Sequence, residues 1–285
     1  MIDIARFALP IVVLIAATAA RGAERWQTLP PTPSLPHGTV NRHAETNGAR
    51  LWYAEWGRAG AHAPVVLLHL GAGSSNYYGA LVPALVAHGY RVIALDTRGH
   101  GRSTRSEAPL SYELMADDVV ALLDRLGIAK ASVVGWSDGG IVGLALARRN
   151  PARVARLFAF GANADPSGAR DDADKNPTFA AYLARAAEEY RQLSPTPDGW
   201  PGLEAALEKL WSAAPNFTAD ELKAIRVPVT IADGEHDEAI RPEHTRYLAA
   251  TIPGARLVIL PGLSHFAFLQ DPQAANAAVL EFLAK

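Results

Sequence analysis

The sequence of 285 residues contains no cysteine and only two methionines. Without cysteine the chain can form no disulfide, no thiolate metal site and no thiol nucleophile, so any chemistry must use oxygen and nitrogen groups. The chain also lacks an excess of charge, because 27 basic and 29 acidic residues give a formal net charge of -2 at pH 7. This balance predicts no nucleic-acid partner and favours a small molecule instead.

Long apolar runs are also scarce, with one exception near the start of the sequence. Arg6 precedes an uncharged apolar run over residues 7–20, and small residues follow before Glu24. The run is shorter than the roughly 20 residues that a membrane span needs, but it fits the apolar region of a secretory signal peptide. We expect residues 1–23 to be an export signal, which would make the protein periplasmic or secreted with no stable membrane span. An uncleaved membrane anchor is the alternative.

The remaining composition, 49% hydrophobic and 20% charged, is ample for one large core. Residues 28–36 carry four prolines, which favour an extended backbone, so residues 24–39 are predicted to be a linker. After this segment, short β-branched runs alternate with longer stretches rich in alanine and leucine. This alternation predicts an α/β fold with strands and helices around a mostly parallel sheet.

Six predicted strands are apolar on both faces, as expected for a sheet covered by helices. They span residues 65–69, 92–96, 132–135, 157–160, 227–232 and 257–260. Predicted helices follow most of them, at residues 79–88, 112–126, 139–149, 242–250 and 273–283. Asp271 and Pro272 are well placed to begin the last helix.

Residues 162–224 break this rhythm, because they contain helical patterns at 178–193 and 203–211 but no convincing strand. Thr218 and Glu221 fit a capping box at the start of a further helix. We expect this segment to be a helical cap over the carboxyl ends of the strands, where open α/β sheets bind ligands. The α/β core would then comprise residues 40–161 and 225–285.

The strongest chemical signal is the sequence GWSDGG at residues 135–140, directly after a predicted strand and before a predicted helix. A serine on such a turn is held in a strained conformation, and flanking glycines let the strand and the helix approach each other. Ser137 is therefore the predicted nucleophile. Because a serine hydroxyl is a weak nucleophile near neutral pH, a base and an orienting acid must lie elsewhere in the chain.

Two later strands end in loops that supply these groups. One loop, residues 233–237, carries Asp233, Glu235 and Asp237, and the other, residues 261–266, carries His265. This order of serine, acid and histidine is typical of hydrolases with a strand-turn-helix nucleophile. We predict His265 as general base and Asp237 as its orienting acid, because a tight turn through Gly234 would face Asp237 back over the strand ends. Asp233 and Glu235 remain alternatives.

Two further loops follow predicted strands. The small-residue loop at residues 69–75 is suited to stabilise an oxyanion, with the backbone N–H groups of Gly71 and Asp138 as the predicted donors. The loop at residues 96–103 has the sequence DTRGHGRS, and we assign it a structural role.

Taken together, these motifs resemble those of the α/β-hydrolase superfamily from about residue 40 to the end of the sequence. The resemblance implies an eight-stranded, mostly parallel sheet, a helical cap, acyl-enzyme chemistry and no metal or cofactor. The sequences GWSDGGI at residues 135–141 and GANA at residues 161–164 are locally similar to valacyclovir hydrolase-like esterases. That similarity implies that Asp138 holds the ammonium group of an amino-acid ester.

The predicted activity is hydrolysis of a small carboxylic ester. Trp136 and Phe266 are candidate substrate contacts, together with Trp200 and Trp211 of the predicted cap. A cofactor-free perhydrolase or a hydrolase of carbon-carbon bonds would use the same three residues. A binding protein of the same fold without turnover is a further alternative. Oligomeric state and substrate identity do not follow from the motifs.

Overall fold

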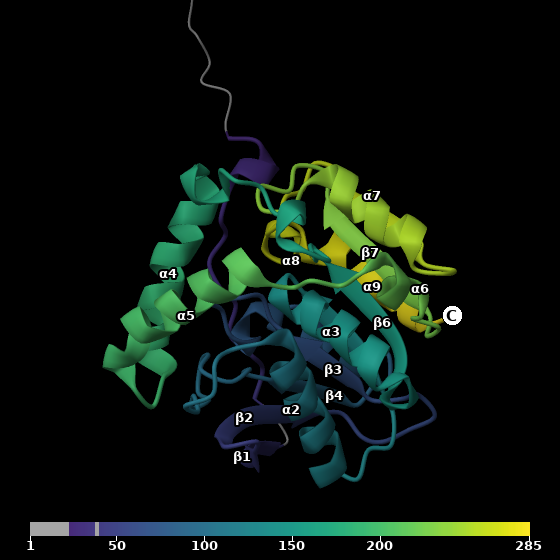
Figure 1. The fold of residues 1–285 in the computed structure, drawn as a ribbon. Coiled ribbons are helices and arrows are strands. Elements are labelled where there is room, and N and C mark those ends of the chain that lie inside the picture. Colours follow the sequence, from purple (N-terminus) through teal and green to yellow (C-terminus); the bar gives the residue numbers. More distant parts are fainter. Residues whose placement is uncertain (1–22, 38–39) are drawn as a thin grey trace, which may run out of the picture.

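The computed structural model describes residues 23–37 and 40–285, which form an eight-stranded sheet with helices on both faces (Figure 1). The strand order is β1-β2-β4-β3-β5-β6-β7-β8. β2 runs antiparallel to both β1 and β4, and the other neighbours are parallel. The predicted α/β-hydrolase fold is therefore confirmed. The strands are β1 (Val40–Thr46), β2 (Ala49–Trp56), β3 (Val65–Leu68), β4 (Val92–Leu95), β5 (Ala131–Trp136), β6 (Val154–Phe160), β7 (Val229–Gly234) and β8 (Arg256–Leu260).

All six strands predicted from the sequence are present, with ends shifted by a few residues. The first two strands were not among them, because β1 is largely polar and does not read as an apolar run. Asn47 and Gly48 join β1 to β2 with φ angles of 44° and 78°. An Asn-Gly pair in this conformation is a strong hairpin signal, so this dipeptide was the feature that could have identified the two strands.

β8 differs from the prediction that each strand is buried on both faces. It has only β7 as a neighbour in the described sheet. The side chains of Leu257 and Ile259 are 43% and 37% exposed. An apolar run predicts a strand, but it does not indicate whether that strand lies inside the sheet or at its edge.

The helices confirm the predicted alternation and cover the sheet. α3 contacts α2 and strands β3, β5 and β6, while α1 contacts α9, which also packs on β6 and β8. Asp271 caps α9 by accepting from the N–H of Ala274, and Thr218 and Glu221 form the predicted capping box. The helices are α1 (Leu81–Ala87), α2 (Tyr112–Arg125), α3 (Asp138–Arg149), α4 (Pro177–Leu193), α5 (Trp200–Ala213), α6 (Ala219–Lys223), α7 (Pro242–Thr251), α8 (Ala267–Gln270) and α9 (Pro272–Leu283).

α4 and α5 lie on one side of the sheet and are well separated from α2 and α3 along most of their length (Figure 1). They come from the region predicted to be a helical cap. Within the described residues, no helix is long and apolar enough to cross a membrane. The predicted export signal, apart from Ala23, lies outside the described residues.

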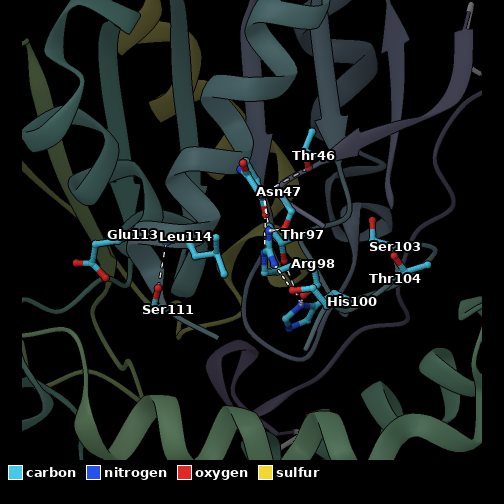
Figure 2. Close-up of polar contacts among 12 residues, drawn as sticks. Thr46, Asn47, Thr97, Arg98, His100, Ser103, Thr104, Ser111, Glu113 and Leu114 are labelled. Carbon is cyan, nitrogen blue, oxygen red and sulfur yellow. Dashed lines mark hydrogen bonds and ion pairs between the residues drawn. The ribbon is translucent and has the colours of Figure 1, made fainter. Parts of the chain in front are cut away.

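The loop after β4 is anchored by a buried ion pair. Arg98 donates to both carboxylate oxygens of Asp118 in α2, at 2.7 Å each, and both side chains are almost fully buried. Asn47 of the β1–β2 turn donates to the same carboxylate at 2.9 Å, and Figure 2 shows Asn47 next to Arg98. These contacts join the β1–β2 turn, the loop and α2, which is consistent with the structural role assigned to the loop.

The described part of the predicted linker packs along the domain. Apart from the short helix Arg25–Gln27, its described residues form no helix or strand. It connects the cap to the core, because it accepts hydrogen bonds from both. The donors are Arg185 of α4 to Leu29 and Pro30, Gln270 of α8 to Trp26 and Thr28, and Trp56 of β2 to Pro36.

Candidate active site

Ser137 lies at the sharp turn between β5 and α3. Its backbone has φ 55° and ψ -119°, a conformation that is unusual for a residue other than glycine. The turn depends on close approach of neighbouring backbone, since a Cβ at Gly135 would lie 2.2 Å from the carbonyl oxygen of Gly139. Such strain costs on the order of 1–3 kcal/mol and is maintained only where the surrounding structure enforces it. The effect here is to place the Ser137 side chain at the carboxyl end of β5.

Asp237 and His265 form a buried hydrogen-bonded pair. Nδ1 of His265 lies 2.7 Å from Oδ2 of Asp237, and neither side chain is more than 3% exposed. The other carboxylate oxygen accepts from the backbone N–H groups of Ala239 and Ile240 at 2.7 and 2.6 Å. The N–H of Asp237 donates to the carbonyl of Gly234 at 3.3 Å, which is the tight turn expected from the sequence.

The two groups shift each other's pKa in opposite directions. Burial by itself would raise the pKa of Asp237, but the charge and hydrogen bond of His265, together with hydrogen bonds from Asp233 and the N–H of Ile240, outweigh burial and lower it. Burial by itself would lower the pKa of His265, but the charge and hydrogen bond of Asp237, with the charges of Glu238 and Asp138, raise it. The imidazole is therefore a stronger base than an isolated histidine.

The other two carboxylates of the acid loop do not contact His265, although Asp233 neighbours Asp237. Asp233 accepts from the hydroxyl of Thr245 at 2.5 Å and from the N–H of Gly234 at 2.9 Å. Glu235 is exposed and accepts from the N–H of Gly262 at 2.8 Å. Of the three carboxylates considered from the sequence, Asp237 is the one that contacts His265.

A cavity of about 380 Å³ lies between the carboxyl ends of the strands and helices α4 and α5. Ser137, His265, Gly71 and Asp138 all line it. No hydrogen bond joins Ser137 to His265 in the part of the chain that the structure describes, although both residues border this one space. Catalytic hydrogen bonds are often longer without substrate and tighten when it binds. Apolar walls come from the cap, chiefly Phe179, Tyr182 and Leu183 of α4 with Trp200, Leu207 and Trp211 of α5.

Comparison with known proteins identifies the family. The family described as "Alpha/beta hydrolase family" matches residues 65–279, three quarters of the chain. This chain belongs to the alpha/beta hydrolase family. It is also 32% identical over 260 residues to a putative carbamate hydrolase, RutD, of Caulobacter sp. (strain K31), covering 82% of this chain and 95% of that one. The protein is accordingly a hydrolase.

Two further comparisons support the same family. The hydrolase is 28% identical over 278 residues to the human serine hydrolase BPHL, covering 88% of this chain and 89% of that protein. Among solved structures it is similar to an enol-lactonase from Burkholderia xenovorans LB400, with a TM-score of 0.69 and 29% identity. That similarity covers 85% of this chain and all of the other.

In this hydrolase Asp138 lines the cavity and is held there by two side chains. Neither was predicted to be its partner. The Tyr112 hydroxyl donates to Oδ1 at 3.0 Å, and Nε1 of Trp211 lies 3.1 and 3.0 Å from the two carboxylate oxygens. Asp138 is 7% exposed. Burial raises its pKa, and the donors Trp211 and Tyr112 with the charge of His265 oppose that rise. Tyr112 and Trp211 belong to apolar helical patterns, and such patterns do not indicate a contact with Asp138.

The loop at residues 69–75 is shaped partly by the cap. Ala72 has a φ of 64°, which is again uncommon for a residue with a side chain. The Tyr182 hydroxyl of α4 donates to the carbonyl of Gly71 at 2.5 Å. The carbonyl of Gly71 is therefore fixed by a helix more than a hundred residues away in the sequence, which sequence patterns did not predict.

Two of the predicted substrate contacts require correction. Trp136 and Phe266 are both 0% exposed, and neither lines the cavity. Trp136 packs against an aromatic cluster beneath the site, namely Tyr77, Tyr78, Phe160, Phe266 and Phe268. Phe266 packs against Trp136 in this buried cluster, so a position next to the nucleophile or the base in sequence does not imply contact with substrate. Trp200 and Trp211 do line the cavity.

Proposed function

We propose that this hydrolase cleaves a small carboxylic ester through an acyl-enzyme intermediate on Ser137. In the proposed mechanism His265 is the general base and Asp237 orients it. The observation that supports this proposal most strongly is the buried Asp237–His265 hydrogen bond of 2.7 Å on the cavity that Ser137 also lines. The strained turn at Ser137 and the raised pKa of His265 are the expected accompaniments of a nucleophile and its base.

In the proposed sequence of steps, His265 accepts the proton of the Ser137 hydroxyl as its oxygen attacks the ester carbonyl. The imidazolium then donates that proton to the leaving alcohol, and the acyl group stays on Ser137. Water, activated by the same imidazole, releases the carboxylic acid. The N–H groups of Gly71 and Asp138 are the proposed oxyanion donors, and loss of one such donor typically costs about 100- to 1000-fold in kcat.

Covalent labelling tests the nucleophile. We expect a fluorescent organophosphonate to label the protein at Ser137, as mapped by mass spectrometry of the labelled peptide, and Ser137→Ala to abolish that labelling. Ser167→Ala is the matched control, because Ser167 is an exposed serine near the cap; it should label like wild type. Undiminished labelling of Ser137→Ala would refute the proposal.

We further propose that the substrate is an amino-acid ester whose ammonium group binds Asp138. Support comes from the position of this buried carboxylate on the same cavity as Ser137 and from the local similarity in sequence noted above. Tyr112 and Trp211 donate to the carboxylate but are both neutral. They therefore do not neutralise its charge, and a cationic group of the substrate can pair with it. A charge-assisted hydrogen bond of this kind contributes about 1.5–3 kcal/mol.

This substrate preference can be measured with p-nitrophenyl esters. We expect an aminoacyl ester to be hydrolysed with a kcat/KM about 10- to 100-fold above that of the acyl ester of equal length that lacks the amine. Asp138→Asn should remove that difference, since the amide can still accept from Tyr112 and Trp211 but has no charge. Glu204→Gln is the control, because Glu204 is an exposed carboxylate at the same cavity. A preference that survives Asp138→Asn would argue against an ammonium site at Asp138.

Other acyl substrates should be tested alongside the p-nitrophenyl esters. Carbamates and enol lactones are included because the names of two similar proteins mention them. Perhydrolysis, in which peroxide replaces water, and cleavage of a carbon-carbon bond would use the same three residues. Turnover of peroxide with a carboxylic acid, compared with turnover of the esters, separates perhydrolysis from hydrolysis. Export from the cytoplasm stays a proposal based on residues 1–23 alone.

A further inference from the structure

We propose that Glu238 is a positioning residue for His265, holding the backbone of the histidine loop and placing a second negative charge beside the imidazole. The proposal rests on the proposed role of His265 as general base. Glu238 directly follows the acid Asp237 in sequence, and its side chain contacts the histidine loop at Ser264 and at the backbone of His265.

The contacts of Glu238 with the histidine loop are specific and buried. Oε2 accepts the backbone N–H of His265 at 3.0 Å, and Oε1 accepts the hydroxyl of Ser264 at 3.2 Å. Glu238 is 6% exposed, while Ser264 and His265 are at most 1% exposed. One carboxylate therefore binds two consecutive residues of the loop. This arrangement restricts rotation of the loop as well as translation, and so restricts where the imidazole ring can lie.

Gln270 also holds the histidine loop, through Ser264. Its Oε1 accepts from the N–H of Ser264 at 2.8 Å, and its Nε2 donates to the Ser264 hydroxyl at 2.9 Å. The same Nε2 donates to the carbonyl of Thr28 in the N-terminal segment at 2.9 Å. Ser264 thus lies between Glu238 and Gln270 with its polar groups satisfied. Because Glu238 and Gln270 both hold this loop, the alignment of His265 does not depend on the Asp237 hydrogen bond alone.

The charges that shift the pKa of the imidazole are all negative. Asp237 binds Nδ1, Glu238 belongs to the same loop, and Asp138 faces the ring from the start of α3. The charges of Asp237 and His265 shift the pKa of Glu238. The hollow that Glu238 borders is also lined by five other charged or titratable residues, namely Arg170, Asp172, Lys175, Glu235 and His236. Among the described residues no lysine or arginine forms an ion pair with Glu238. Because Arg170 and Lys175 form no ion pair with Glu238 among these residues, the imidazolium that forms as Ser137 is deprotonated is a positive charge that Glu238 can stabilise.

The direction of this interaction follows from the pKa shifts. Burial and the charge of Asp237 raise the pKa of Glu238, and the charge of Glu238 in turn contributes to raising the pKa of His265. Removal of that charge should lower the pKa of His265. Since His265 must be neutral to act as a base, the acid limb of the pH profile of kcat/KM should then move to lower pH.

The test compares Glu238→Gln, Glu238→Ala and the control Glu235→Gln. Glu235 also joins the acid loop to the histidine loop, through Gly262, but it is exposed, and the charges that raise the pKa of His265 are those of Asp237, Glu238 and Asp138. We expect the acid limb of Glu238→Gln to move down by about half a pH unit or more, with kcat within a few-fold of wild type. Glu238→Ala should lose about 10- to 100-fold in kcat at nearly unchanged KM. Glu235→Gln should change neither quantity.

An NMR titration of the His265 imidazole gives a second readout that does not need turnover. Its midpoint should be lower in Glu238→Gln than in wild type and unchanged in Glu235→Gln. A midpoint and an acid limb that coincide with wild type, or full kcat in Glu238→Ala, would overturn the proposal. Labelling of wild type at a serine other than Ser137 would instead overturn the proposed function, so the two failures are distinguishable.

Discussion

Asp237→Asn is expected to lower kcat about 10,000-fold while leaving the fold and KM nearly unchanged. The amide is almost the same size as the carboxylate, but it has lost the charge that raises the pKa of His265. Its NH₂ group would also favour the imidazole tautomer with the proton on Nε2, which can no longer accept the proton of Ser137. The measurement is steady-state hydrolysis of a p-nitrophenyl ester, with circular dichroism to verify folding.

Asp233→Asn is the matched control for this substitution. Asp233 lies in the same segment and is as deeply buried, but its side chain contacts Thr245, the N–H of Gly234 and Asp237 rather than His265. Burial, together with the charge of Asp237, raises the pKa of Asp233, so a neutral amide resembles the protonated acid. We expect a loss in kcat of less than about tenfold. If both substitutions lowered kcat equally, the assignment of Asp237 as the orienting acid would fail.

The second large effect concerns stability. Asp118→Ala is expected to lower the free energy of unfolding by about 3–5 kcal/mol, because it leaves the Arg98 guanidinium buried without a counter-charge. Arg98 is 0% exposed and makes two hydrogen bonds of 2.7 Å to Asp118, and Asn47 loses its acceptor in the same variant. Urea denaturation followed by circular dichroism measures the change.

Asp117→Ala provides the comparison, since it removes a neighbouring aspartate of the same helix. Asp117 pairs with Arg149 at 3.0 Å, but the two side chains are 43% and 35% exposed. Exposed pairs of this kind contribute at most about 1 kcal/mol. Similar losses in the two variants would show that the ion pair of Arg98 contributes no more than a surface contact.

Several features of this hydrolase followed from the sequence because they depend on neighbouring residues. Apolar runs predicted six of the eight strands, and glycines around Ser137 predicted the sharp turn whose close contacts exclude a Cβ. Parallel strands place their carboxyl ends along one edge of a sheet, so the loops that carry Ser137, Asp237 and His265 had to meet there. Helices α4 and α5 were predicted for a similar reason, because their periodicity interrupts the alternation of strands.

The tertiary structure alone decided which side chains in these loops meet and which are buried. Asp233, Glu235 and Asp237 lie within five residues, yet only the path of the backbone determines that Asp237 contacts His265. Trp136 is excluded from the cavity by packing against aromatic residues from three other segments. The contacts of Asp138 with Tyr112 and Trp211, and of Glu238 with the histidine loop, likewise join distant parts of the chain. Sequence periodicity reflects the local backbone, whereas contacts between distant segments depend on the complete packing of the fold.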